Sequence, residues 1–112
     1  MAVTLAPPSA PPLVVRYRGM SDWWGRHVWI EEGGVRRSLP YRGEALGVGY
    51  AWGRRGIGSR ELARSILRHA TGSDVLAERF CRDLTHDVIA HMSELSFELD
   101  REDVLSWLAT RR

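Results

Sequence analysis

The sequence predicts an α+β fold, in which a small antiparallel sheet of about three strands is followed by two or three helices packed on one face. Alternation of apolar and polar residues is concentrated before residue 40, whereas apolar residues at helical spacing begin only after residue 58. Ten of the eleven glycines fall between residues 19 and 58, where turns must connect the strands and lead into the helices. Strands followed by helices are typical of α+β domains and argue against a βαβ nucleotide-binding fold.

Three strands are expected before residue 40, over residues 13–18, 26–32 and 35–39. The stretch between the first two, residues 19–25, is expected to be a loop. The pair Gly33–Gly34 is a strong hairpin signal. Strands that follow one another through hairpins form an antiparallel sheet.

Alternation along these strands assigns their side chains to two faces. The face that helices would cover carries Val15, Tyr17, Val28 and Ile30. The opposite face would carry Arg16, Arg18, His27, Trp29 and Arg36. Arginines interleaved with an aromatic residue suit a single-stranded nucleic acid or an acidic protein. The alternative is that other parts of the chain cover Trp29 and that the arginines are merely solvated.

Two helices are expected after the glycine-rich stretch. The first covers residues 59–71 and is ended by Gly72. The second is longer and is capped by Ser73, with an apolar stripe that runs from Leu76 to Met92.

The last part of the chain is expected to hold a short strand over residues 96–99 and a third helix. Asp100 and Asp103 have the spacing of a capping box, which marks the start of that helix. Its buried residues would be Val104, Trp107 and Leu108.

The length of 112 residues favours a single domain over residues 13–112. Residues 1–12 contain four of the five prolines and are expected to form a disordered leader outside the fold. These residues do not resemble a signal peptide, and the sequence has no apolar run long enough to span a membrane. A single cysteine, Cys81, excludes an internal disulfide. We therefore expect a cytoplasmic protein that does not act at a membrane.

Charge is distributed unevenly along the chain. All sixteen basic residues are arginine. Residues 1–72 hold 11 arginines and 5 acidic residues, a net charge of +6, whereas residues 73–112 hold 5 arginines and 9 acidic residues, a net charge of −4. The basic first part is therefore the more promising region for anionic partners.

In the stretch GVGYAWGRRGIGSRELARSIL, residues 47–67, a glycine-rich loop leads into a helix, which is an arrangement that can bind phosphate groups. Gly53 and Gly58 have the spacing of a P-loop, but Ser59-Arg60 stands where that motif requires lysine followed by serine or threonine. The dinucleotide pattern G-x-G-x-x-G also fails. Two interpretations of this loop remain. The helix start could bind an anion, with Arg54, Arg55 and Arg60 around it, or the glycines could have a purely structural role.

The same stretch carries a family resemblance. Its W-G-x-x-G-x-G loop and following L-A-x-x-I-L helix resemble those of a family of small uncharacterised bacterial and phage proteins, a domain of unknown function. The likeness extends through YRG (17–19), VWI (28–30), LP (39–40), SFEL (96–99) and WL (107–108). The resemblance implies a shared fold and a phage or mobile-element setting, and no activity. The chain departs from the family pattern at Arg54, Ile57 and Ser59.

No catalytic set, metal site or cofactor site is evident. Cys81 lies on the apolar stripe of its helix and is expected to be a packed thiol. Asp83, Asp87 and His91 share a helix face, which a solvated polar surface explains better than a metal site.

Two adjacent tryptophans, Trp23 and Trp24, cannot both face the core in an extended chain, and an exposed tryptophan suggests an interface. The leading hypothesis is a non-enzymatic interaction module that binds a host protein or nucleoprotein complex and inhibits a host defence system. The alternatives are direct binding of single-stranded nucleic acid by the arginine–tryptophan sheet face, and binding of a phosphate or nucleotide at the glycine-rich loop. The oligomeric state is left open.

Overall fold

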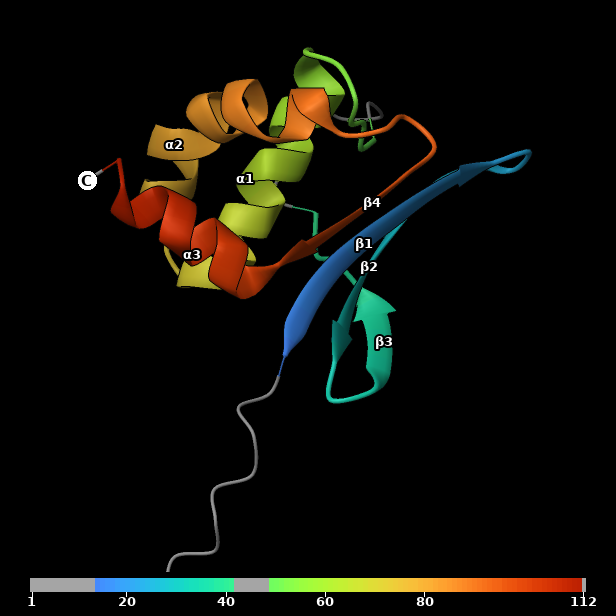
Figure 1. Ribbon diagram of the computed structural model, residues 1–112, viewed down its shortest axis with the longest axis horizontal. Coiled ribbons are helices and arrows are strands. Elements are labelled where there is room, and N and C mark those ends of the chain that lie inside the picture. Colours follow the sequence, from blue (N-terminus) through green and yellow to red (C-terminus); the bar gives the residue numbers. More distant parts are fainter. Residues whose placement is uncertain (1–13, 42–48, 112) are drawn as a thin grey trace, which may run out of the picture.

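The computed structural model describes residues 14–41 and 49–111, and the leader predicted over residues 1–12 lies outside this range. It confirms the α+β class, with four antiparallel strands and three α-helices (Figure 1). The elements in chain order are β1 (Val15–Asp22), β2 (Gly25–Glu32), β3 (Val35–Ser38), α1 (Ile57–Thr71), α2 (Asp74–Asp87), the 3₁₀ turn η1 (Ile89–His91), β4 (Ser96–Asp100) and α3 (Arg101–Ala109).

The sheet has the strand order β3-β2-β1-β4. The first three strands form a meander, and β4 returns from the far end of the chain to pair antiparallel with β1. The short strand expected over residues 96–99 therefore joins the sheet, which has one strand more than the three expected from the first part of the chain. This long-range pairing brings the acidic end of the chain against the basic beginning.

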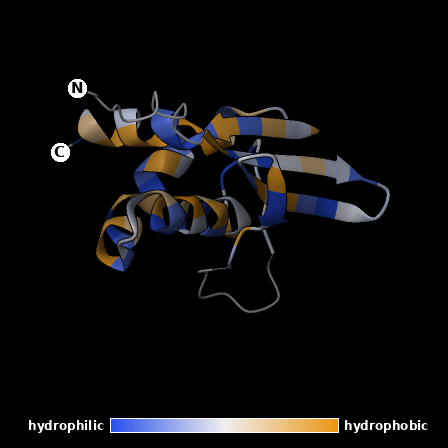
Figure 2. Cartoon of the chain, turned by 90° about the horizontal axis from the view of Figure 1, so that it is seen from below, coloured by the Kyte–Doolittle hydropathy of each residue, from blue (hydrophilic) through white to orange (hydrophobic). Residues whose placement is uncertain are grey.

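Alternation along the strands produces the two faces that the sequence predicts. Val15 and Tyr17 of β1 and Ile30 of β2 are buried beneath the helices. Figure 1 shows all three helices on the same side of the sheet, and Figure 2 shows hydrophobic and hydrophilic residues alternating along the strands. Burial of one face fixes the register, because a slip by one residue would expose these side chains.

The loop expected over residues 19–25 is wrong, because β1 continues to Asp22 and only Trp23 and Trp24 form the turn. Gly19 misled the prediction, since glycine usually weakens a strand. Here it is buried opposite Phe97 of β4, and a Cβ at Gly19 would lie 2.2 Å from Phe97 Cε2. The glycine thus makes room for an aromatic ring on the inner face of the sheet.

The first helix, α1, begins two residues earlier than expected, at Ile57, and ends as expected. Gly72 adopts the left-handed conformation with φ of 74°, and its N–H donates to the Arg68 carbonyl at 2.8 Å. The Ser73 side chain then caps α2 by accepting a hydrogen bond from the Leu76 N–H at 3.1 Å.

The expectation of one helix reaching Met92 is wrong, because α2 ends at Asp87 and the chain turns through η1. The break lets the carbonyl of Ile89 accept a hydrogen bond of 2.9 Å from the N–H of Gly53, and it buries the Ile89 side chain completely. A tertiary contact therefore overrides the helical periodicity of the segment.

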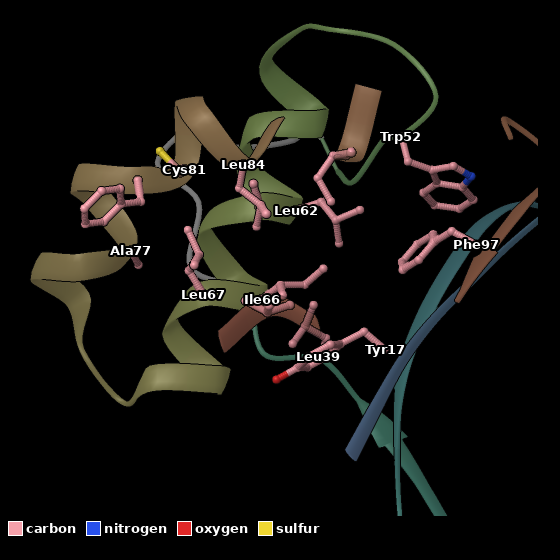
Figure 3. Packing of buried hydrophobic residues seen from close by; sticks show 14 of the residues in the cluster. Tyr17, Leu39, Trp52, Leu62, Ile66, Leu67, Ala77, Cys81, Leu84 and Phe97 are labelled. Atoms are coloured by element: carbon pink, nitrogen blue, oxygen red, sulfur yellow. The ribbon is translucent and has the colours of Figure 1, made fainter. Parts of the chain in front are cut away.

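The hydrophobic core lies between the sheet and the helices (Figure 3). Trp52 is fully buried and meets Phe97 edge-on, with ring centroids 5.0 Å apart. Leu62 and Ile66 of α1 are also fully buried, and Cys81 of α2 is a buried free thiol. The burial of Cys81 confirms the packed thiol that the sequence predicts.

A polar contact crosses this core. The Tyr17 hydroxyl and Nδ1 of His69 share a hydrogen bond of 2.8 Å between β1 and α1. Burial raises the pKa of Tyr17 and lowers the pKa of His69, so both groups are neutral near pH 7.

The last helix, α3, starts at the capping box that the sequence predicts, where the Asp100 N–H donates to Asp103 Oδ2 at 3.3 Å. Val104 and Leu108 are buried as expected. Trp107 is only partly buried, and its Nε1–H donates to Asp87 Oδ2 at 3.0 Å. Within the described residues, no helix has the length and apolar composition needed to cross a bilayer.

Candidate functional site

Trp23 and Trp24 form the tip of the β1–β2 hairpin and are the most exposed large apolar side chains among the described residues. Their exposed fractions are 99% and 89%. Figure 1 shows the hairpin extending well beyond the helices, so that its tip stands free of the body of the domain. The sequence predicts that the two tryptophans cannot both be buried, and the structure leaves both outside.

The backbone of this tip is held by local interactions. Asp22 Oδ1 accepts hydrogen bonds from the Trp24 N–H at 2.8 Å and from the His27 ring at 3.0 Å. The hydrogen bond with His27 is the main cause of a lowered pKa at Asp22, and the hydrogen bond from the Trp24 N–H lowers this pKa further. Gly25 closes the turn with φ of 123°, a conformation that other residues rarely adopt. The tip therefore presents its two indoles from an ordered turn.

Two further exposed apolar side chains belong to the same end of the sheet. Met20 of β1 is 49% exposed, and Leu95, just before β4, is 71% exposed. The Ser21 N–H donates to the Leu95 carbonyl at 2.8 Å, which fixes this segment beside the hairpin. We call Met20, Trp23, Trp24 and Leu95 the hairpin patch.

The outer face of the sheet carries the arginines and the tryptophan that the sequence places there. Register pairs Arg18 with Trp29 across β1 and β2, and Trp29 with Ser38 across β2 and β3. Arg16 in turn lies opposite Glu31, which lies opposite Arg36. Because all three helices lie on the other side of the sheet, no described helix covers this face. His27, opposite Met20 in the register, lies on this face as well, so the predicted grouping of Arg16, Arg18, His27, Trp29 and Arg36 is correct.

Each arginine of this outer face has a carboxylate partner. Arg16 Nε donates to Asp100 Oδ1 at 2.8 Å and lies 3.5 Å from Glu98 Oε1. Arg18 contacts Glu31 at 3.3 Å and Glu98 at 3.5 Å. The closest contact between Arg36 and Glu31 is 3.5 Å. Three guanidinium groups thus face three carboxylates, and the charges of these six groups cancel.

Trp29 belongs to the same network and is not a free stacking platform. Its Nε1–H donates to Glu31 Oε2 at 3.1 Å, and the guanidinium of Arg36 lies over its ring, 4.3 Å from the centroid. The hydrogen bond from Trp29, followed by that from Arg18, lowers the pKa of Glu31. The hydrogen bond to Asp100 likewise raises the pKa of Arg16. These shifts indicate that the ionised forms are the ones stabilised on this face.

Sequence reasoning missed the three carboxylates of this network. Glu31 could have been placed on the outer face from the alternation in β2. Glu98 and Asp100 could not, because they reach the arginines only through the pairing of β4 with β1.

The glycine-rich loop has a structural role at the residues that define its motif. Gly53 has φ of 77°, and a Cβ there would lie 2.9 Å from the Met92 carbonyl oxygen. A Cβ at Gly58 would lie 2.9 Å from the Ala51 Cβ. The buried Ser59 hydroxyl donates to the Arg54 carbonyl at 2.6 Å and ties the loop to α1. The glycines thus allow the loop to pack closely behind Trp52.

The arginines of this loop are exposed and differ from those of the sheet face. Arg54 and Arg55 are exposed and Arg60 is partly buried. Among the described residues, no carboxylate lies within ion-pairing distance of these three side chains.

The structure adds two residues of α2 to this loop, namely Arg82 and His86. They line one pocket together with Arg55, Gly56, Arg60 and Thr85. Nothing in the sequence pattern indicates that these residues lie close together, because their proximity depends on how α2 packs against α1. We call Arg55, Arg60, Arg82 and His86 the α1 corner.

In the described residues, no group of three or more His, Cys, Asp and Glu side chains is placed to hold a metal ion. Asp87 is instead engaged by Trp107 and by Arg111 from α3 and the residues after it.

Comparison with known families shows that residues 17–110 match the model of a family of unknown function, DUF6166. Comparison with the curated proteins and with the solved structures returns no match.

Proposed function

The chain belongs to the DUF6166 family of unknown function, and from this premise we propose that it is a non-enzymatic interaction module. In this proposal the tip of the β1–β2 hairpin inserts Trp23 and Trp24 into an apolar cleft of a partner protein. The observation that carries the proposal is the almost complete exposure of two adjacent tryptophans, 99% and 89%.

Exposed indoles contribute nothing to the folding of this domain. Each has a surface of roughly 150–250 Å² that can be buried in a complex, which makes tryptophan a common hot-spot residue. Both belong to the two-residue turn at the end of a hairpin, and Met20 and Leu95 add exposed apolar surface at the same end of the sheet. A narrow apolar tip suits a cleft in a partner better than it suits a flat surface.

The hairpin is also well prepared for binding. Both of its strands have eight residues and are paired along their full length, and Asp22 holds the turn from within. An ordered tip loses little conformational entropy when it binds, so more of the burial energy appears as affinity.

The partner to be tested first is a host protein or nucleoprotein complex, because the resemblance of the sequence implies a phage or mobile-element setting. Inhibition of a host defence system is the activity to assay once a partner has been captured. Nucleic-acid binding through the sheet face has less support, because Arg16, Arg18 and Arg36 already pair with carboxylates. A phosphate would have to compete with these internal partners.

The test is affinity capture from a host lysate with the tagged chain, with and without nuclease, followed by measurement of Kd for any captured protein. Replacing both tryptophans by alanine should abolish capture. Each single substitution should weaken the purified complex about thirtyfold, which corresponds to about 2 kcal/mol of binding free energy.

The matched control is Val75→Ala on α2, which trims another exposed apolar side chain, 76% exposed, far from the hairpin in sequence. This variant should retain every partner. Capture that survives Trp23→Ala/Trp24→Ala would exclude the hairpin tip as the binding element. Capture that nuclease removes would favour the nucleic-acid alternative.

A further inference from the structure

We propose that the α1 corner is a binding site for a small phosphorylated ligand. The site is separate from the hairpin patch and adds an anion-binding activity to the proposed interaction module. It consists of a pocket of about 330 Å³ whose described lining residues include three arginines and one histidine and no acidic residue.

The cations of this pocket come from three separate parts of the fold. Arg55 belongs to the glycine-rich loop, Arg60 to the first turns of α1, and Arg82 and His86 to α2. A neighbouring pocket shares Arg55 and adds Arg26 and Arg54, and the residues that the structure describes in its lining again include no acidic one. Five arginines therefore surround two adjoining pockets.

These arginines lack the partners that other arginines of this chain have. Arg16, Arg18, Arg36, Arg37, Arg64, Arg68 and Arg111 each contact a carboxylate. Among the described residues, Arg54, Arg55, Arg60 and Arg82 contact none. Grouping like charges without counter-charges is unfavourable, and a bound anion would remove that cost.

The described carboxylate that contacts His86 does not fill this role. Asp87 Oδ1 lies 3.1 Å from His86 Nδ1, but its Oδ2 is occupied by the Trp107 indole N–H and by Arg111. The carboxylate thus orients the His86 ring and is absent from the pocket lining. Because the Thr85 hydroxyl donates to the Cys81 carbonyl, the donors available to a ligand are the arginines and His86.

The start of α1 adds to the positive electrostatic potential that these side chains produce in the pocket. No side chain caps this helix start, and no acidic residue lies in its first turn. The helices α2 and α3 both have acidic residues there, and a free helix start adds partial positive charge. Gly56, at this helix start, lines both pockets.

The charge and the size of the pocket indicate the class of ligand. Arginine forks bind the oxygens of phosphate groups in pairs, and several arginines favour a group with at least two negative charges. The pocket lies at the lower end of the range for small-molecule sites, roughly 300–1,000 Å³, and therefore has room for more than one phosphoryl group. A diphosphate group, free or on a small molecule, is the ligand that this argument selects.

The test uses inorganic pyrophosphate as the probe and titration calorimetry on the full chain, with sodium chloride at matched ionic strength as reference. Pyrophosphate should bind with one site per chain, and Arg60→Gln and Arg82→Gln should each weaken Kd at least about tenfold. The matched control is Arg79→Gln, which removes the same charge from α2 at a residue outside both pockets. It should change Kd less than about twofold.

A second arm compares pyrophosphate with inorganic phosphate, sulfate, a nucleoside diphosphate, a nucleoside and a single-stranded oligonucleotide. The nucleoside diphosphate and the nucleoside show whether a base adds to the affinity. Thermal melts of each free variant show that it is folded. Equal binding of pyrophosphate and sulfate, or equal losses in Arg79→Gln and Arg82→Gln, would overturn the proposal, because only diffuse charge would then be acting. Binding of a single-stranded oligonucleotide without binding of pyrophosphate would overturn it as well.

Discussion

The outer face of the sheet and the α1 corner both gather three arginines, but their charges are in opposite states. On the sheet face, Arg16, Arg18 and Arg36 each contact a carboxylate. At the α1 corner, no described carboxylate pairs with Arg55, Arg60 or Arg82. The difference teaches that arginine content alone does not identify an anion site. What counts is whether the fold brings carboxylates to the arginines.

The same contrast applies to the tryptophans. Trp29 on the sheet face is held by Glu31 and Arg36. Trp23 and Trp24 have exposed side chains, and the hairpin to which they belong extends beyond the helices (Figure 1). Groups held by internal partners stabilise the fold, whereas groups without partners are available for binding.

The largest expected effect comes from removing the carboxylates of the sheet face. The triple variant Glu31→Gln, Glu98→Gln and Asp100→Asn leaves the three arginines without their carboxylate partners, while asparagine still caps α3. Affinity for a single-stranded oligonucleotide at low salt should rise at least about thirtyfold above that of the wild type. The slope of log affinity against log salt should be roughly −2, as for three phosphate contacts. Fluorescence anisotropy over a salt series measures both quantities.

A second triple variant controls for net charge. Asp83→Asn, Glu94→Gln and Glu102→Gln remove the same number of charges from residues off the sheet face. If this variant gains as much affinity, the pairing on the sheet face is not what suppresses binding.

The next largest effect is a difference in the free energy of unfolding between a variant of Trp29 and a variant of the hairpin tip. Trp29→Ala removes a hydrogen bond to Glu31 and the ring beneath Arg36, and should lower the free energy of unfolding by about 1–2 kcal/mol. Trp23→Ala/Trp24→Ala should change it by less than about 0.5 kcal/mol, because both side chains are already in water. Urea denaturation followed by circular dichroism measures both. A large loss in the double variant would mean that the tip has a structural role.

A smaller difference is expected between single arginines. Arg18→Gln leaves Glu31 and Glu98 with fewer partners and should cost about 0.5 kcal/mol, a value typical of exposed pairs. Arg82→Gln should be neutral or slightly stabilising, because it relieves repulsion at the α1 corner. Added salt should shrink both effects. Equal destabilisation by the two substitutions would contradict the view that arginines of the sheet face are paired and those of the α1 corner are not.

The smallest effect is a change of stability with pH. The pKa of Glu31 is lowered in the folded chain, so its stabilising contribution is present above the unfolded value of about 4.3. That contribution is lost as pH falls through the folded pKa, and the sheet face then becomes cationic like the α1 corner. Thermal melts between pH 6 and pH 3 should show a shallower acid decline for Glu31→Gln than for the wild type.

His69 contributes in a separate pH range. Its pKa is lowered chiefly by burial, with Glu32 acting against this and Arg101, Arg37 and Arg68 assisting it. The folded state therefore favours neutral His69, and stability should begin to fall as pH drops below the unfolded value of about 6.5. A decline between pH 7 and pH 5 that His69→Phe removes would confirm this assignment. Persistence of the decline in that variant would assign it to other groups.

The sequence alone determined the α+β class, the hairpin turn at Gly33–Gly34, the two faces of the first strands and most helix ends, because these depend on local periodicity, glycine and capping residues. It also indicated that Trp23 and Trp24 cannot both be buried, since neighbours in an extended chain point in opposite directions, whereas the exposure of both is seen only in the structure. The sequence did not determine that β1 continues through Gly19. That continuation depends on Phe97 of the distant strand β4, whose ring occupies the space where a side chain at position 19 would lie.

Only the tertiary structure decided which arginines are free. Glu98 and Asp100 reach Arg16 and Arg18 through pairing of strands about eighty residues apart in the chain, and Arg82 joins Arg55 and Arg60 through helix packing. Local patterns carry no information on such contacts, because they follow from how distant elements meet. The physical reason is that a charge acts through space, so its partner is set by the fold and not by its neighbours in the sequence.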